Sequence, residues 1–324
     1  MKNLEDKVAL VTGATRGIGK GIAIGLAEAG ATVYITGRSL NTSSNALSGS
    51  LSETQLAIDE IGGVCIPVRV DHSDDEQVRL LFERIQDEQN GQLDLLVNNA
   101  YSGVQALKDA YGQPFWDCEP SIWDASNNVG LRSHYIASVF AARMMTKRNS
   151  GLICTISSWG SMSYIFNTAY GAGKAACDRL AADMAVELKP HNVASVSIWP
   201  GIVGTELFSR FASEMNQNNA TEKNNSFLSD RYNWETPLLT GRVIAALAGE
   251  PNVMRRTGRV QIVAELAHKY GIVDENGEQP ASLRSLRFVL PAALPVLRNY
   301  LWLIPDIKVP WSLLLLNALS SPKI

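Results

Sequence analysis

The sequence has few of the residues that build disulfide frameworks, metal sites and charged tails. It contains 4 cysteines and 4 histidines in 324 residues, and no two cysteines form a CxxC pair. Spacing of this kind predicts reduced thiols, no metal site and no disulfide scaffold. The 29 basic residues nearly balance the 32 acidic ones, and they form no basic block. Nothing in this charge pattern indicates a nucleic-acid partner.

Long uninterrupted apolar runs are also missing. A strand-like run, Val8–Val11, begins almost at once and leaves no room for a secretory signal before it. Leu283–Leu319 is rich in Leu, Trp and Pro, but Arg298, Asp306, Lys308 and four prolines interrupt it. A membrane-spanning helix needs about 20 consecutive apolar residues. We therefore expect an intracellular protein that is not secreted and whose last segment does not span a bilayer.

Short β-branched runs alternate with longer helical patterns up to about residue 265. Strands are predicted over 7–12, 32–36, 64–70, 93–98, 151–157, 194–199 and 259–263. Helices are predicted near 17–29, 52–61, 74–87, 120–147, 168–188 and 237–248. This order is typical of an α/β fold with a Rossmann-type, doubly wound parallel sheet of seven strands and helices on both faces.

Three segments depart from this rhythm. Residues 39–50 are rich in Ser and Asn and predict a surface loop. Residues 213–236 predict a mobile loop, helical in part, over an active site, or else an insertion that is merely tolerated. We expect residues 1–265 to form one domain. Residues 266–324 then form an apolar extension packed on that domain, on another subunit or on a membrane surface.

A glycine-rich turn with the spacing Gly-x3-Gly-x-Gly follows the first predicted strand and opens a helix. Glycines let the backbone turn sharply and approach a pyrophosphate, which the N–H groups and dipole of the helix start attract. In this strand–turn–helix context the pattern predicts a dinucleotide site. The residues concerned are Gly13, Thr15, Arg16, Gly17, Ile18 and Gly19.

The end of the second predicted strand favours NADP(H) over NAD(H). It lacks the acidic residue that would bind a ribose 2′-hydroxyl, and Arg38 follows instead. Arg16, in the glycine turn, supplies a second guanidinium suited to a 2′-phosphate. The alternative is that both arginines are solvated surface residues.

Tyr170 and Lys174 are four residues apart in a predicted helix, so they lie on one face. A lysine ammonium one turn away favours the phenolate, which lets the tyrosine exchange a proton with a carbonyl oxygen. Ser158 ends a strand twelve residues earlier and could polarise that carbonyl. Its neighbour Ser157 is the rival for this role.

Further motifs end other strands. Asn98 ends the fourth, Asp71 follows the third and suits an adenine amino group, and residues 200–205 suit a nicotinamide carboxamide. Together the motifs over residues 5–265 resemble the short-chain dehydrogenase/reductase family. The resemblance implies that Ser158, Tyr170 and Lys174 carry catalysis, with Lys174 also holding the nicotinamide ribose. It implies that cofactor is bound by Gly13, Thr15, Arg16, Gly17, Ile18, Gly19, Arg38, Asp71, Asn98, Tyr170, Lys174, Pro200, Val203 and Thr205.

One position departs from the family pattern. Seven residues after Trp123 the family has an asparagine that kinks a helix and holds a water in a proton relay, and here that residue is Gly130. Glycine can still permit a kink. Either its carbonyl or Asn127, on nearly the same face, could hold the water.

The stretch 98–105 and the C-terminal extension resemble the member 1 branch of this family, found in animals with bacterial relatives. That resemblance implies reduction of lipophilic carbonyl compounds and association with the cytoplasmic face of the endoplasmic reticulum. An apolar pocket lining is expected from Tyr101, Trp159, Met162, Tyr164, Phe166 and Phe208. A homo-oligomer is expected through small faces with Ala137, Ala141, Ala175, Ala176, Ala181 and Ala185. The alternative is an NADP-binding regulatory or membrane-surface protein with weak catalysis.

Overall fold

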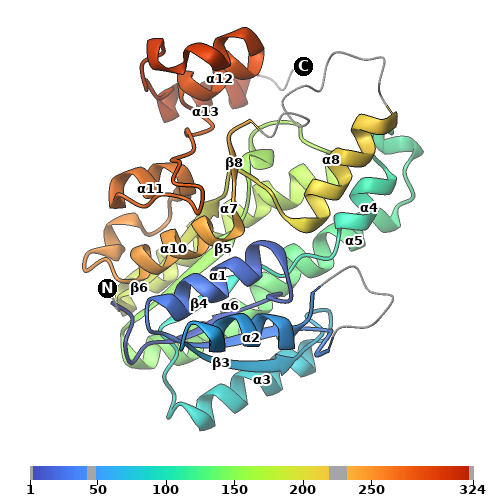
Figure 1. The fold of residues 1–324 in the computed structure, drawn as a ribbon. Coiled ribbons are helices and arrows are strands. Elements are labelled where there is room, and N and C mark those ends of the chain that lie inside the picture. Colours follow the sequence, from blue (N-terminus) through green and yellow to red (C-terminus); the bar gives the residue numbers. More distant parts are fainter. Residues whose placement is uncertain (1–2, 42–48, 219–231, 321–324) are drawn as a thin grey trace.

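The computed structural model describes residues 3–41, 49–218 and 232–320. Its centre is a parallel sheet of seven strands in the order β3-β2-β1-β4-β5-β6-β9 (Figure 1). The strands are β1 (Val8–Val11), β2 (Thr32–Gly37), β3 (Val64–Arg69), β4 (Leu95–Asn98), β5 (Gly151–Ile156), β6 (Val193–Trp199) and β9 (Val260–Ile262). Each falls on a segment predicted to be extended. The predicted Rossmann-type sheet is confirmed, and its order reverses between β1 and β4, where such sheets bind ligands.

Helices cover both faces of the sheet. One face carries α1 (Gly17–Glu28), α2 (Leu51–Glu60), α10 (Pro237–Ala248) and α11 (Val263–Tyr270). The other carries α3 (Asp75–Glu88), α6 (Ser133–Arg148) and α7 (Thr168–Leu188). Except for the edge strand β3, the strands between them are almost wholly buried, as parallel strands covered on both faces must be. Leu266 and Ala267 belong to this core, so the packed domain continues past residue 265.

The helix predicted over 120–147 is broken at Gly130. It divides into α5 (Ser121–Asn127), a kinked segment over Asn128–Arg132 with non-helical backbone angles at Val129 and Gly130, and α6. Gly130 has φ +145°, a value that residues with a side chain rarely adopt. A Cβ atom there would also lie 2.5 Å from the ring of Tyr101. Glycine is therefore required both by the backbone and by the ring packed against it.

The remaining elements lie around the carboxyl ends of the strands. They are α4 (Val104–Asp109), β7 (Ile202–Val203), α8 (Glu206–Asn218) and β8 (Trp234–Glu235). The predicted loop over 213–236 thus begins as the end of α8 and ends in β8. Its residues 219–231, like 42–48 of the predicted surface loop 39–50, lie outside the described residues.

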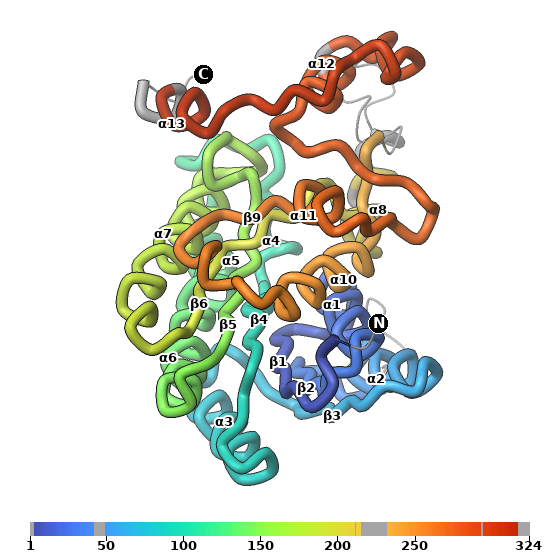
Figure 2. The backbone as a smooth tube through the Cα atoms, turned by 90° about the vertical axis from the view of Figure 1, so that its left-hand side faces the viewer, coloured from blue at the N-terminus to red at the C-terminus, as the bar shows by residue number. Residues whose placement is uncertain are grey.

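The C-terminal extension contains α12 (Leu286–Ala293), a 3-10 segment over Pro295–Leu303, and α13 (Trp311–Ser320). Figures 1 and 2 show it in red as a separate layer at one end of the molecule. Throughout the ranges that the structure describes, every helix is too short or too polar to cross a membrane.

The expected oligomer face needs a correction. Ala137, Ala141, Ala181 and Ala185 are at most 4% exposed and pack inside the subunit. They lie on the sides of α6 and α7 that face the sheet, so these four do not form the expected face, whereas Ala175 is exposed and Ala176 is half-buried. The small side chains let these helices approach their own core closely.

Candidate active site

A cleft of about 1540 Å³ opens at the carboxyl ends of the strands. Residues from distant parts of the chain line it, because the crossover order of the sheet brings the ends of their strands together. Every site residue predicted from sequence lines it except Asn98. Those residues are Gly13, Thr15, Arg16, Gly17, Ile18, Gly19, Arg38, Asp71, Ser158, Tyr170, Lys174, Pro200, Val203 and Thr205.

The glycine turn folds too tightly for side chains. A Cβ atom on Gly19 would lie 2.3 Å from the carbonyl oxygen of Gly13, which itself has φ +70°. The Asn99 Nδ2 donates to the carbonyl oxygens of Thr12 at 2.8 Å and Gly13 at 3.0 Å. The turn is thus held against the end of β4. Its amide groups at the start of α1 suit the pyrophosphate of a dinucleotide.

Asn98 does not reach the cleft. It is fully buried, and its Nδ2 donates to Ser138 Oγ at 2.8 Å on α6. Successive side chains of a strand point to opposite faces, so Asn99 lines the cleft in its place. The sequence marked this place by two consecutive asparagines, Asn98 and Asn99, but it did not show which of the two faces the cleft.

The far end of the cleft holds the groups expected to bind adenosine. The Asp71 Oδ1 accepts hydrogen bonds from Ser73 N at 2.9 Å and Ser73 Oγ at 2.7 Å. The backbone hydrogen bond of Ser73 is the main cause that lowers the pKa of Asp71, and the charge of Arg38 adds to it. Asp71 is therefore an ionised, oriented acceptor. Arg38 is exposed beside it at the cleft.

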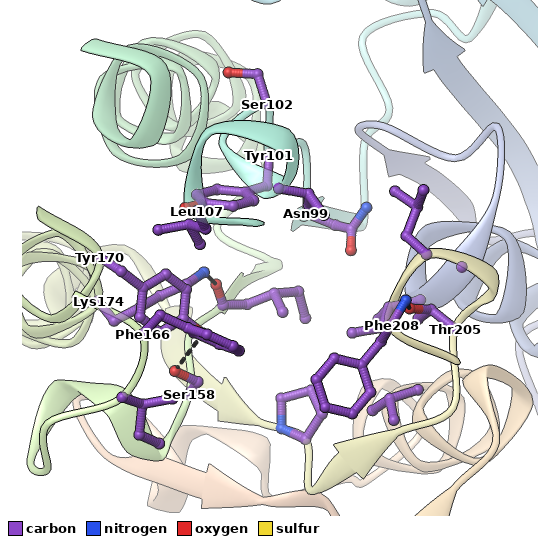
Figure 3. Close-up of a pocket in the computed structure, with 18 of the residues that line it drawn as sticks. Asn99, Tyr101, Ser102, Leu107, Ser158, Phe166, Tyr170, Lys174, Thr205 and Phe208 are labelled. Carbon is purple, nitrogen blue, oxygen red and sulfur yellow. Dashed lines mark hydrogen bonds between the residues drawn. The ribbon is translucent and has the colours of Figure 1, made fainter. Parts of the chain in front are cut away.

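Three side chains meet near the middle of the cleft (Figure 3). The Tyr170 hydroxyl donates to Ser158 Oγ at 2.9 Å. Lys174 is 8% exposed, and its Nζ donates to the carbonyl oxygen of Ile156 at 3.0 Å. Ser157 also borders the cleft, but it is buried and its Oγ donates to the backbone carbonyl of Lys174 at 3.0 Å. Of the two serines, only Ser158 is placed beside Tyr170.

Local structure sets this arrangement. The side chain of Asn167 caps α7 by accepting from Tyr170 N at 2.9 Å, so Tyr170 lies in the first turn. Lys174 follows one turn later on the same face. Ser158 lies two residues after the end of β5 and caps the short helical turn that follows it. A phenol and a hydroxyl in contact, with an ammonium near both, can donate a proton to a substrate oxygen.

Both groups considered for the water position have protein partners. The Gly130 carbonyl oxygen lies 3.2 Å from the Cys177 thiol, which donates to it. The Asn127 Nδ2 donates to the carbonyl oxygens of Trp123 at 3.1 Å and Ala169 at 3.3 Å. Asn127 thus ties α5 to α7, whereas its Oδ1 is buried and has no hydrogen-bond partner among the described residues.

Two glutamates that the sequence reasoning missed contact the backbone of the site. The exposed Glu206 begins α8, and its Oε2 accepts from Gly17 N at 3.1 Å. Glu235 is 2% exposed, and its Oε2 accepts from Gly201 N at 2.8 Å. Burial raises the pKa of Glu235 to about 7. Neither has a sequence signal, because each is distant in the chain from the turn that it contacts.

The apolar lining agrees largely with expectation. Tyr101, Trp159, Tyr164, Phe166 and Phe208 line the cleft, and Figure 3 shows Tyr101 and Phe208 on different sides of it. Met162 instead packs beside buried residues at the ends of β6 and β9. The extension contributes lining residues that were not foreseen: Leu283, Phe288, Val289 and Ala292.

Comparisons with known proteins agree on one family. A family model described as short chain dehydrogenase matches residues 7–216. Human "Dehydrogenase/reductase SDR family member 1" is 47% identical over 289 residues, 89% of each chain. "NADPH-dependent aldehyde reductase 2, chloroplastic" of Arabidopsis thaliana is 31% identical over 211 residues, 63% of this chain and 75% of that protein.

A solved structure shares the fold. It is a 7α-hydroxysteroid dehydrogenase complexed with NADH and 7-oxo glycochenodeoxycholic acid, 26% identical, with a TM-score of 0.65 over 86% of this chain and 96% of that one. The parallel sheet of this chain agrees with this likeness. The chain therefore belongs to the short-chain dehydrogenase/reductase family of oxidoreductases, in the branch of the member 1 proteins.

Proposed function

We propose that this oxidoreductase reduces lipophilic ketones or aldehydes to alcohols with NADP(H), and that Tyr170 is its general acid and base. The observation that carries the proposal is the hydrogen bond of Tyr170 to Ser158 beside Lys174, in a cleft lined by aromatic side chains. An apolar wall around a few convergent polar groups suits a lipophilic carbonyl compound such as a steroid.

The cofactor supplies the hydride when it is bound. Ser158 Oγ holds the substrate carbonyl by a hydrogen bond, and the Tyr170 hydroxyl gives its proton to the carbonyl oxygen. Lys174 lies with its Nζ 5.8 Å from the centre of the Tyr170 ring, where its charge stabilises the phenolate left behind. Backbone groups of residues 200–205 hold the carboxamide, and Lys174 holds the nicotinamide ribose.

The choice of NADP(H) rests on charge at the end of β2. Arg16 and Arg38 line the cleft there, and β2 ends at Gly37 without a carboxylate. The Arabidopsis relative is named for NADPH and aldehydes, whereas the hydroxysteroid dehydrogenase was solved with NADH. The relatives therefore do not indicate whether this chain prefers NADPH or NADH. The guanidinium groups of Arg16 and Arg38 favour the 2′-phosphate of NADP(H).

We place a homo-oligomer contact on the outward sides of α6 and α7. Tyr135 and Val186 are 52% and 73% exposed there, and the mass in solution tests this contact. We assign peripheral membrane contact at the endoplasmic reticulum to the exposed residues of the extension, such as Trp302, which liposome sedimentation tests. Residues 1–265 are proposed as the catalytic domain and 266–324 as the extension, whose first residues complete α11 in the core of that domain.

The alternative is a regulatory protein that binds NADP but has weak catalysis, and Gly130 at the relay position favours it. A screen of ketones and aldehydes that follows NADPH absorbance separates the two. We expect turnover by the wild type and none by Tyr170→Phe, which loses only the transferable proton and keeps NADPH binding. Tyr270→Phe, at a tyrosine whose hydroxyl contacts Glu250 away from the cleft, is the control. Sizeable turnover by Tyr170→Phe contradicts the assignment.

A further inference from the structure

The C-terminal extension reaches into the cleft that holds Tyr170. Leu283, Phe288, Val289 and Ala292 line this cleft, and all four lie in or just before α12. Phe288 is half-buried, whereas Leu290 on another side of the same helix is exposed and does not line the cleft. One side of α12 thus faces the cleft and another faces solvent.

The segment leading into β8 holds this helix in place. The rings of Tyr232 and Phe288 stack with their centres 6.3 Å apart and planes at 12°. The Tyr232 hydroxyl donates to the carbonyl oxygen of Arg287 at 2.7 Å. Asn233 exchanges two hydrogen bonds with the backbone of Ala281, at 2.9 and 2.7 Å. Phe288 is therefore held through its ring by Tyr232, and the chain before α12 is held by Asn233.

A second set of contacts ties the extension to the residues beside Ser158. The ring of Trp311 lies 5.8 Å from that of Trp199, which lies 5.7 Å from that of Trp159. Trp159 directly follows Ser158 and lines the cleft. Arg284 forms an ion pair of 2.6 Å with Glu265 on α11. The position of the extension is thus set relative to the reacting groups.

Apolar residues of other elements line the same cleft, among them Leu107 on α4 and Phe208 on α8. Two cations at this end, Lys108 and Arg210, both form ion pairs with Glu214, which offsets their charge. The cleft, at about 1540 Å³, exceeds the ~300–1,000 Å³ of a typical ligand site. It has room for a cofactor and for a long apolar molecule beside it.

We infer that α12 is the outer wall of the substrate site and that the enzyme prefers elongated apolar carbonyl compounds. The end of the substrate far from the carbonyl packs on Phe288 and Val289, while the carbonyl lies at Tyr170. This inference rests on the proposed reductase function. Phe288 and Val289 are therefore specificity-determining residues.

The test compares straight-chain aldehydes as substrates of the full-length enzyme with NADPH. For the wild type we expect kcat/KM to rise from butanal through octanal to dodecanal. Phe288→Ala should lower kcat/KM for dodecanal by about tenfold, or about 1.4 kcal/mol, and for butanal by much less. Val289→Trp, at a residue 40% exposed, should block the long substrates without disturbing the core. Leu290→Ala is the matched control and should follow the wild type.

Binding of dodecanol, followed by tryptophan fluorescence, gives a readout that needs no turnover. If the wild type binds dodecanol tightly and Phe288→Ala binds it about tenfold more weakly, the wall is supported even when no aldehyde is reduced. The absence of aldehyde reduction would overturn only the proposed reductase function. If both variants keep the wild-type dependence on chain length and the wild-type affinity for dodecanol, the wall is wrong.

Discussion

The adjacent serines that follow β5, Ser157 and Ser158, make different contacts. Ser158 Oγ contacts the Tyr170 hydroxyl, whereas Ser157 Oγ is buried against the backbone of α7. The one-residue difference matters because neighbouring side chains of an extended segment point in opposite directions. The same rule separates Asn98 from Asn99. Single-residue offsets of this kind decide which groups of the motif face the substrate.

Arg38 allows a prediction about cofactor choice. A charge-assisted hydrogen bond to the 2′-phosphate contributes about 1.5–3 kcal/mol, so Arg38→Ala should weaken NADPH binding about tenfold or more. NADH lacks that phosphate, and its affinity should change little. Fluorescence titration with both cofactors measures this.

Arg69→Ala provides the comparison for Arg38→Ala. Arg69 is an exposed arginine at the end of β3 that does not line the cleft. Its loss should leave both affinities unchanged. Equal affinities of the wild type for NADPH and NADH would refute the assignment of the 2′-phosphate site.

At the scale of elements, the short pair β7 and β8 supports the loop expected to hold the carboxamide. The two strands are parallel, with Val203 paired to Glu235. Glu235 then holds the amide of Gly201 with a buried carboxyl group. A Cβ atom on Gly201 would lie 2.3 Å from Glu235 Oε1, so the contact has no spare room. The geometry of the cofactor loop thus depends on one buried acid.

Stability should depend on pH through Glu235. Burial is the main cause that raises its pKa from 4.5 to about 7, and the charge of Asp274 adds to it. The folded state therefore holds this proton more tightly than the unfolded state. The stabilisation is full below about pH 4.5 and is lost as pH rises toward about 7, a change of about 3 kcal/mol.

Glu235→Gln should remove this dependence. Urea unfolding at pH 5 and pH 8 gives the free energy of unfolding of each form. We expect the variant to gain up to about 3 kcal/mol relative to the wild type between the two pH values. A difference between variant and wild type that is the same at both pH values would show that Glu235 ionises normally.

At the scale of the molecule, the extension and the sheet domain form one site. The packed core includes Leu266 and Ala267 of α11, and Glu265 on that helix pairs with Arg284 of the extension. The change in composition after residue 265 therefore does not mark the end of the packed domain. Activity and attachment of the extension should consequently be coupled.

Trp311→Ala tests that attachment. It removes the ring contact with Trp199 and the contact of Arg284 with the indole, 5.1 Å from its centre. An aromatic pair contributes about 0.5–1.5 kcal/mol, so the detached population should rise about two- to tenfold. Trypsin cleavage after Arg298 and Lys308 should accelerate by the same factor, since proteolysis follows the open population. Trp302→Ala, at a residue 76% exposed, is the control, and equal cleavage rates would contradict the attachment.

The sequence by itself determined the seven strands, the helices between them and most of the site. These are local properties: β-branched runs, glycine spacing and the Tyr170–Lys174 interval are set by neighbours in the chain. Gly130 was identified from sequence as a departure, but its fit against the Tyr101 ring appeared only in the fold.

Tertiary structure alone decided the rest. The sides of α6 and α7 that carry Ala137 and Ala181 were expected to meet another subunit, and the fold turned them to the sheet. Glu206, Glu235 and Phe288 reach the site from segments distant in the chain, and no local pattern marks such contacts. Periodicity shows that a helix has an apolar side, but only the packed molecule shows what that side touches.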